Sequence, residues 1–179
     1  MLDLTDVPQD KTSGLPPVHQ WTPDFCGDMA LLIKANGDWV HEGDKIKRPK
    51  MVTMFSRILW YENAEYFLVT PVEKVRVQVE DAPFLVTKWR YIETEKGQAI
   101  EFTTLTDDVV VLGESCDLWL SGENQHERPY ISMRYGMKAM LHRNVFYQLA
   151  ETLQSVSTEQ GSGMGLVSAN KAYLLIPDE

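Results

Sequence analysis

Residues 68–77 read Leu68-Val69-Thr70-Pro71-Val72-Glu73-Lys74-Val75-Arg76-Val77, which is two apolar runs interrupted by a turn signal. Proline fixes its own φ and cannot continue a central strand, so this stretch predicts a strand over residues 66–70 and another over residues 72–79. In the second strand valines alternate with charged residues, which indicates one apolar face and one face in water. The stretch therefore predicts a hairpin that carries charge on one side.

The chain on either side of this hairpin predicts two halves of an α+β protein. Glu80-Asp81-Ala82-Pro83 punctuates the sequence, and we place the boundary there. Upstream, Pro49 predicts the start of a helix whose apolar spacing runs to Leu59 and which Asn63 ends. Downstream, a second helix is predicted over residues 144–155 and a Ser/Gly-rich loop over residues 157–165. We expect an extended arm (1–22) and two repeats (23–82 and 83–179), each a small, mostly antiparallel sheet with one helix.

The two halves show an internal repeat. Ile46-Lys47-Arg48 aligns without a gap with Leu141-His142-Arg143, and the apolar helix faces that follow are in phase. After a small insertion, Leu68-Val69-Thr70 meets Leu166-Val167-Ser168. Short apolar patterns also match by chance, so duplication and coincidence are both compatible with the alignment.

Charge disfavours nucleic acid as a partner. The 179 residues have a formal net charge of −9, and an acidic protein repels the phosphate backbones from which nucleic-acid binding gains most of its affinity. The hydrophobic content of 44% is sufficient for a core. One local basic cluster is compatible with a small anionic ligand; its members are Lys45, Lys47, Arg48, Lys50 and Arg57.

Cysteine usage and hydropathy predict a cytoplasmic protein without a membrane span. Cys26 and Cys116 are the only cysteines, and a secreted chain of this size usually carries more. Residues 1–18 lack a basic segment followed by an apolar run, which argues against a signal peptide. No stretch approaches the roughly 20 apolar residues of a membrane-spanning helix.

Several common catalytic and cofactor motifs are absent from the sequence. The four histidines have no paired spacing of the zinc-binding kind, and neither a Gly-x-Ser-x-Gly elbow nor a phosphate-binding Gly-Lys-Ser/Thr loop occurs. Gly161-Ser162-Gly163-Met164-Gly165 mimics a dinucleotide fingerprint, but it follows a helix and precedes a strand, the reverse of the required order. We interpret it as a flexible loop, and the sequence leaves any cofactor unknown.

The two arginines that precede the predicted helices are candidate anion ligands. Free amides and the dipole attract anions to a helix N-terminus, and a flanking Arg48 or Arg143 would add bidentate recognition. Ion pairs between these arginines and nearby acids explain their presence equally well.

The predicted turns supply further candidates for a polar site. Glu73, Lys74 and Arg76 lie beside the turn at Thr70, and Ser168 occupies the equivalent place in the second half. Two such corners facing each other would form a mixed-charge cleft between the halves, which suits a small polar ligand. The alternative is a hairpin corner with solvated charges.

Two other functions remain compatible with these residues. Glu73, Glu80 or Asp81 could serve as acid or base in an enzyme, with a divalent cation bound where Pro83 turns the chain. Glu80 and Asp81 are equally compatible with a plain connector, because adjacent residues on a strand point to opposite faces. A protein-interaction module using sheet edges is the third hypothesis.

The chain as a whole resembles an uncharacterised bacterial family, catalogued as domain of unknown function 1285. The resemblance rests on the blocks Pro16-Pro17-Val18-His19, Phe25-Cys26-Gly27-Asp28, Gly37-Asp38-Trp39, Leu68 to Val75, and Val79-Glu80-Asp81-Ala82-Pro83-Phe84. It is weaker towards the C-terminus, where the family's Ser-Gly-Gly turn is replaced by Ser168-Ala169-Asn170.

The resemblance implies a duplicated α+β core whose second half is loosely like pleckstrin-homology domains. It also implies a ligand site between the halves, for a nucleotide-like molecule, and a role in signal transduction, and it brings no catalytic activity with it. Our leading hypothesis, which rests on Arg48, Arg143 and the two polar turns, is a regulatory protein that binds a small anionic ligand between its two halves.

Overall fold

The computed structural model describes residues 14–123 and 126–178, and the boundary between two compact units falls between Pro83 and Phe84. Part of the expected N-terminal arm, residues 1–13, lies outside the described residues. The described part of that arm contains a single 3-10 turn, η1 (Val18–Gln20).

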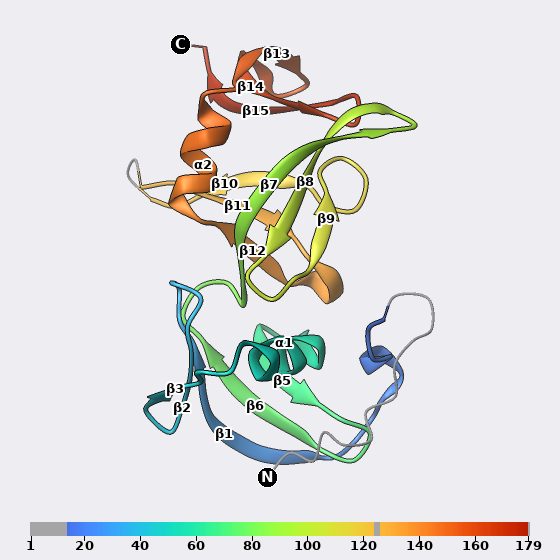
Figure 1. The fold of residues 1–179 in the computed structure, drawn as a ribbon, viewed down its shortest axis with the longest axis vertical. Helices are drawn as coiled ribbons and strands as arrows, with labels where there is room; N and C mark the ends of the chain where they lie inside the picture. Colours follow the sequence, from blue (N-terminus) through green and yellow to red (C-terminus); the bar gives the residue numbers. More distant parts are fainter. Residues whose placement is uncertain (1–13, 124–125, 179) are drawn as a thin grey trace. The chain divides into compact units, whose positions relative to one another are not determined.

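The first unit is a mixed six-stranded sheet with one α-helix (Figure 1). Its elements are β1 (Phe25–Ile33), β2 (Trp39–His41), β3 (Asp44–Lys45), α1 (Pro49–Arg57), β4 (Leu59–Glu62), β5 (Glu65–Val69) and β6 (Lys74–Val79). The strand order is β3-β2-β1-β6-β5-β4. Only the central neighbours β1 and β6 run parallel; all other neighbours are antiparallel.

The hairpin predicted around Thr70 is confirmed. β5 and β6 pair antiparallel with Leu68 opposite Val75, and the Thr70 hydroxyl accepts the Glu73 amide at 3.0 Å. Such a bond from a threonine side chain to the backbone stabilises the turn locally. Thr70 is buried, so its hydroxyl is engaged within the turn.

Helix α1 covers one face of this sheet and ends earlier than predicted. Phe55 stacks on Trp39 of β2 with ring centroids 6.4 Å apart, which anchors the helix to the core. The helix ends at Arg57, and Leu59, which the periodicity placed in the helix, begins β4. The residues after it are aromatic and pair across a tight turn whose Asn63 and Ala64 have φ of 51° and 63°. Strand pairing therefore overrides the local helical spacing.

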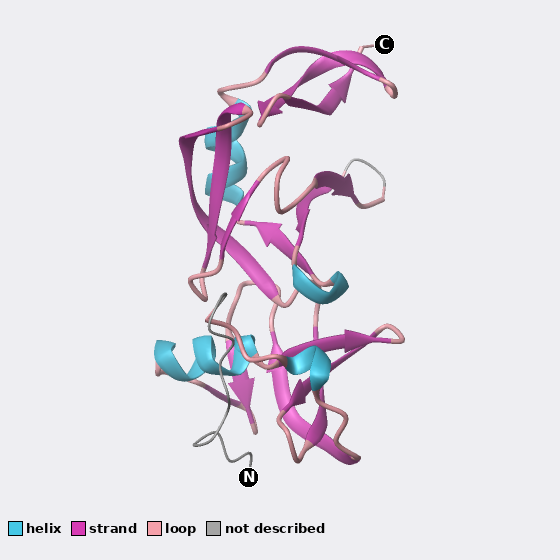
Figure 2. Cartoon of the chain, turned by 90° about the vertical axis from the view of Figure 1, so that its right-hand side faces the viewer, coloured by secondary structure: helices cyan, strands magenta, loops and turns pink. Residues whose placement is uncertain are grey.

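The second unit contains a mixed six-stranded sheet and a separate three-stranded sheet (Figures 1 and 2). Its elements are β7 (Phe84–Thr94), β8 (Gly97–Thr104), β9 (Val109–Val111), β10 (Leu118–Ser121), β11 (Arg128–Ser132), η2 (Arg134–Gly136), β12 (Lys138–Leu141), α2 (Arg143–Ala150), β13 (Gln154–Thr158), β14 (Gly161–Ser168) and β15 (Lys171–Pro177). The sheet orders are β10-β11-β12-β7-β8-β9 and β13-β14-β15. Again the central pair, β7 and β12, is parallel.

The two six-stranded sheets are related. Read from β9, the second sheet runs β9-β8-β7-β12-β11-β10, which is the order of the first sheet with every strand number raised by six. The helices take different places: α1 lies between the third and fourth strands, whereas α2 follows the sixth. Sheet order therefore equates β1 with β7. The alignment predicted from sequence, with Thr70 on Ser168, equates β5 with β14 instead.

Residues 157–165 are not the flexible loop that their composition indicated, because β13 and β14 occupy them. The glycines serve close packing of backbones. A Cβ at Gly163 would lie 2.1 Å from the Ile176 carbonyl oxygen, and one at Gly165 would lie 2.1 Å from that of Tyr173. Glycine is required there because β15 passes too near for any side chain.

Ser168 joins the two sheets of the second unit. Its hydroxyl is fully buried, donates to the Leu112 carbonyl oxygen at 2.7 Å and accepts the Ile100 amide at 2.7 Å. The neighbouring Ala169 amide donates to the Gln98 carbonyl oxygen at 3.0 Å. The three-stranded sheet is thereby fixed to β8 and to the segment after β9.

Replacing Ser168 by alanine is expected to lower the free energy of unfolding by about 1–3 kcal/mol, because two buried backbone groups lose their partner. Urea titration followed by far-UV circular dichroism measures the change. Ser121→Ala, at an exposed position on β10, is the matched control and should stay within about 0.5 kcal/mol of the parent. Equal effects of the two substitutions would contradict the structural role assigned to Ser168.

The two cysteines are expected to differ in reactivity. Cys26 is exposed, whereas Cys116 is buried and desolvation raises the pKa of its thiol to about 12. The thiolate is the reactive form of cysteine. When the folded protein is mixed with an aromatic disulfide reagent near pH 8, Cys26 should therefore react rapidly and release one equivalent of the aromatic thiolate. A second equivalent should appear only in denaturant. Cys26→Ser should abolish the rapid phase; its persistence would show that Cys116 is accessible.

Candidate functional site

The charged residues predicted on β6 lie on the face of the first sheet opposite α1, here called the outer face. Val79 shares the inner face with Ile33 and Trp39, its neighbours across the sheet, and α1 packs on Trp39. Successive residues of a strand alternate in direction, so Lys74 and Arg76 point to the other side. Cross-strand pairing adds further residues to the outer face: Trp60, Glu62, Glu65, Phe67 and Val69.

Arg76 is held between two carboxylates on the outer face. Its Nε donates to Asp28 Oδ1 at 2.6 Å and its Nη1 donates to Glu65 Oε1 at 2.7 Å. The hydrogen bond from Arg76 lowers the pKa of Asp28, and the two acids raise the pKa of the guanidinium. A cavity of about 650 Å³ lies here, lined by Asp28, Arg76 and Glu80 among others. The guanidinium is already satisfied in this arrangement.

Lys74 forms a second cluster on the same face. The Lys74 ammonium pairs with Glu62 and lies 4.4 Å from the centre of the Phe67 ring. Glu62 also accepts a hydrogen bond from the Trp60 indole N–H at 3.2 Å. The hydrogen bonds from Lys74 and then Trp60 lower the pKa of Glu62. A cavity of about 290 Å³ adjoins this cluster, where His19 and Trp21 from the N-terminal segment meet Trp60 and Lys74.

The remaining predicted residues of the first unit are mostly engaged locally. Thr70 and Glu73 form the turn between β5 and β6, and Glu80 Oε2 accepts the Ala35 amide at 2.8 Å. Asp81 follows directly and is half-buried. The structure thus brings Arg76 and Glu80 to one cavity and Lys74 to another.

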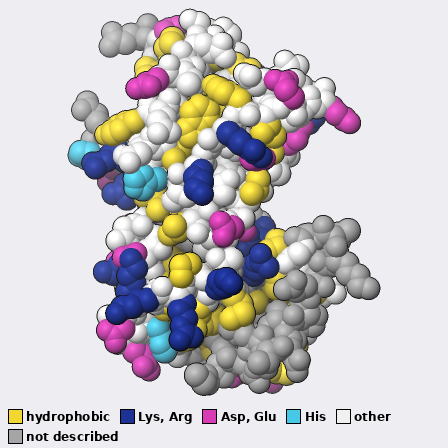
Figure 3. All heavy atoms as spheres, viewed as in Figure 1, with side chains coloured by type: hydrophobic (Ala, Val, Ile, Leu, Met, Phe, Trp, Pro, Cys, Tyr) yellow, Lys and Arg dark blue, Asp and Glu magenta, His cyan; other side chains and the backbone are white. Residues whose placement is uncertain are grey.

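Cations predominate on the face of the first unit around α1 (Figure 3). We call it the basic surface; it comprises Lys45, Lys47, Arg48, Lys50 and Arg57. Lys45 pairs with Asp38 at 2.6 Å, and Arg57 donates to the Gly14 carbonyl oxygen at 3.5 Å. The other three are exposed and form no ion pair with the described part of the chain.

Arg48 and Arg143 both lie at the start of a helix, but their positions differ. Arg48 is the N-cap residue of α1, where no side chain caps the helix and Pro49 is the first helical residue. Arg143 is itself the first residue of α2, whose amide at Asn144 already donates to the His142 ring at 3.2 Å. Arg143 is exposed, and it belongs to the second unit.

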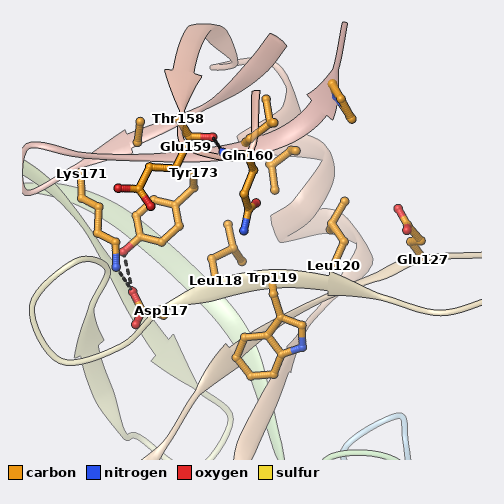
Figure 4. Close-up of a pocket in the computed structure, with 14 residues that line it drawn as sticks. Asp117, Leu118, Trp119, Leu120, Glu127, Thr158, Glu159, Gln160, Lys171 and Tyr173 are labelled. Atoms are coloured by element: carbon orange, nitrogen blue, oxygen red, sulfur yellow. Dashed lines mark hydrogen bonds and ion pairs between the residues drawn. The ribbon is translucent and has the colours of Figure 1, made fainter. Parts of the chain in front are cut away.

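Sequence reasoning missed a groove between β10 and β15 within the second unit (Figure 4). We call it the β10–β15 groove; its volume is about 760 Å³. At one end Lys171 Nζ and the Tyr173 hydroxyl donate to Asp117 Oδ1 at 2.5 and 3.0 Å. These bonds lower the pKa of Asp117. The position of β10 at a sheet edge follows from strand pairing, which no short stretch of the sequence indicates.

Two further properties concern the described residues only. They contain no group of three or more His, Cys, Asp or Glu side chains placed to hold a metal ion. Within them, no helix combines the length and apolar character that crossing a bilayer requires.

Comparison with known proteins identifies the family. Residues 16–82 match the N-terminal domain of DUF1285, a domain of unknown function, and residues 83–175 match its C-terminal domain. The crystal structure of a DUF1285 family protein from Silicibacter pomeroyi DSS-3 is 36% identical, covers 93% of this chain and 90% of that chain, and has a TM-score of 0.81. A second, from Shewanella baltica OS155, is 27% identical, covers 70% and 94% respectively, and has a TM-score of 0.56.

No curated protein matches the sequence. Both domain matches occur in order along the chain, and the Silicibacter structure matches along nearly its whole length. The chain therefore belongs to the DUF1285 family.

Proposed function

We propose that the protein is a regulatory protein of bacterial signal transduction that binds a small anionic, nucleotide-like ligand at the basic surface. The observation that supports this is the state of Lys47, Arg48 and Lys50. In a chain of net charge −9, these three exposed cations lie close together in sequence and lack acidic partners among the described residues. A bound anion would relieve their mutual repulsion.

Side chains, more than helix amides, would recognise the ligand. Pro49 has no amide hydrogen, and the Met51 amide already donates to the Arg48 carbonyl oxygen at 3.0 Å. The start of α1 therefore offers few free donors. The Arg48 guanidinium supplies a planar pair of N–H groups that matches two phosphate oxygens, with lysines on either side in sequence as point charges.

We further propose that the second unit has a pleckstrin-homology-like, curled sheet. Its two edge strands, β9 and β10, are separated only by residues 112–117. Those residues fold into a tight turn in which the Gly113 amide donates to the Cys116 carbonyl oxygen at 2.9 Å. A connection this short could not reach from one edge of a flat six-stranded sheet to the other, which supports a curled sheet. As a second point of support, α2 directly follows β12, the last strand of this sheet in sequence.

The proposal predicts that ADP stabilises the protein at low ionic strength. At a concentration 100 times Kd, a ligand raises the free energy of unfolding by about 2.7 kcal/mol, which corresponds to a rise in Tm of several degrees. The triple variant Lys47→Ala, Arg48→Ala, Lys50→Ala should lose most of this rise. Differential scanning fluorimetry with ADP, AMP and inorganic phosphate measures it.

The matched control removes three exposed cations from the second unit, as Lys88→Ala, Arg90→Ala, Lys96→Ala. It has the same net charge as the first variant, so it should retain the response to ADP. If both variants lost the ADP-dependent rise in Tm equally, the rise would depend only on net charge. If the first variant kept the full rise, the basic surface would not be the binding site.

A further inference from the structure

The β10–β15 groove is bounded by two unpaired sheet edges. β10 is one of the two edge strands of the six-stranded sheet, and β15 is one of the two edge strands of the three-stranded sheet. Consecutive residues line the groove on both sides, 117–120 on one and 171–175 on the other. Because side chains alternate between faces, an unbroken run of lining residues means that the backbone edge itself is exposed to the groove.

The backbone groups on these edges have no partner across the groove. In the described chain, no backbone hydrogen bond joins β10 to β15; β10 bonds to β11 and β15 bonds to β14. Only side chains connect the two strands, through Asp117 with Lys171 and Tyr173. An edge of this kind is a template for an added strand.

The lining combines apolar and acidic side chains. Figure 4 shows Leu118 and Leu120 on the β10 side, with Tyr173 opposite and Glu159 and Gln160 above the gap. Asp117, Glu127 and Glu159 contribute negative charge, and Lys171 is the single cation among the lining residues. Glu127 and Glu159 form no ion pair with any described residue. The groove therefore complements an occupant that is both apolar and basic.

We propose that this groove binds an extended segment of a partner protein, in which basic and apolar residues alternate, as an added strand along β15. The backbone of the segment would pair with the free edge of β15. Its apolar side chains would contact Leu118 and Leu120, and its basic side chains would face Glu127 and Glu159. A second copy of this chain fits the groove poorly, since it would bring the same acids against these acids.

The test uses the full-length protein and a fluorescein-labelled peptide of alternating lysine and valine, about ten residues long. Fluorescence anisotropy at about 0.15 M salt measures Kd. A second peptide carries N-methyl groups on alternate backbone amides, which preserves charge and removes strand hydrogen bonds. A third replaces lysine by glutamate. Both are expected to bind at least about tenfold more weakly than the first.

Charge reversal locates the binding. Glu127→Lys with Glu159→Lys should weaken binding of the lysine peptide about tenfold or more. The control, Glu93→Lys with Glu95→Lys, alters two exposed acids elsewhere in the second unit and should change Kd less than about twofold. Amide chemical shifts in ¹⁵N-labelled protein should change along residues 118–121 and 171–176.

Three results would overturn the proposal. Equal weakening in both charge-reversed variants would show attraction to net charge alone, and undiminished binding of the N-methylated peptide would show that no strand is added. A concentration-dependent dimer that Glu127→Lys with Glu159→Lys dissociates, without peptide binding, would assign the groove to self-association. Sedimentation velocity on the same samples measures that last outcome.

Discussion

Parallel pairing at the centre of each six-stranded sheet is the constraint on which the rest of the structure depends. Parallel neighbours cannot be joined by a tight turn, so the chain must leave the centre and return after several strands. In the first unit β1 and β6 are such a pair, and in the second β7 and β12. The strands between them are thereby forced outward. This places β6, with Arg76, beside Asp28 of β1, and it leaves β10 at an edge.

The crossing from one edge of each sheet to the other is made in two ways. α1 spans the distance between β3 and β4 in the first unit, and it covers the inner face as it does so. In the second unit a tight turn replaces the helix, and α2 leads on to an additional sheet. The two sheets therefore have related strand orders but carry different surfaces. The outer face carries satisfied ion pairs, whereas the groove beside β15 retains unpaired backbone.

Local signals in the sequence predicted local structure well. Thr70-Pro71 indicated the hairpin, the alternation around Lys74 and Arg76 indicated an exposed face, and Pro49 marked the start of α1. The predicted end of α1 and the loop predicted at residues 157–165 were wrong, because pairing with other strands determines the structure at both places. The partners of Lys74 and Arg76 and the edge position of β10 follow from strand register and order, which no short stretch encodes.

The hydrogen bonds of the Ser168 hydroxyl affect how the second unit unfolds locally. It ties β14 to β8, so the two sheets that form the walls of the groove share one buried hydrogen-bonded junction. Neither wall can fray far without exposing that junction, which makes the pair a single cooperative unit in native-state hydrogen exchange. Occupation of the groove would then slow exchange throughout both sheets, including amides that lie far from any bound segment.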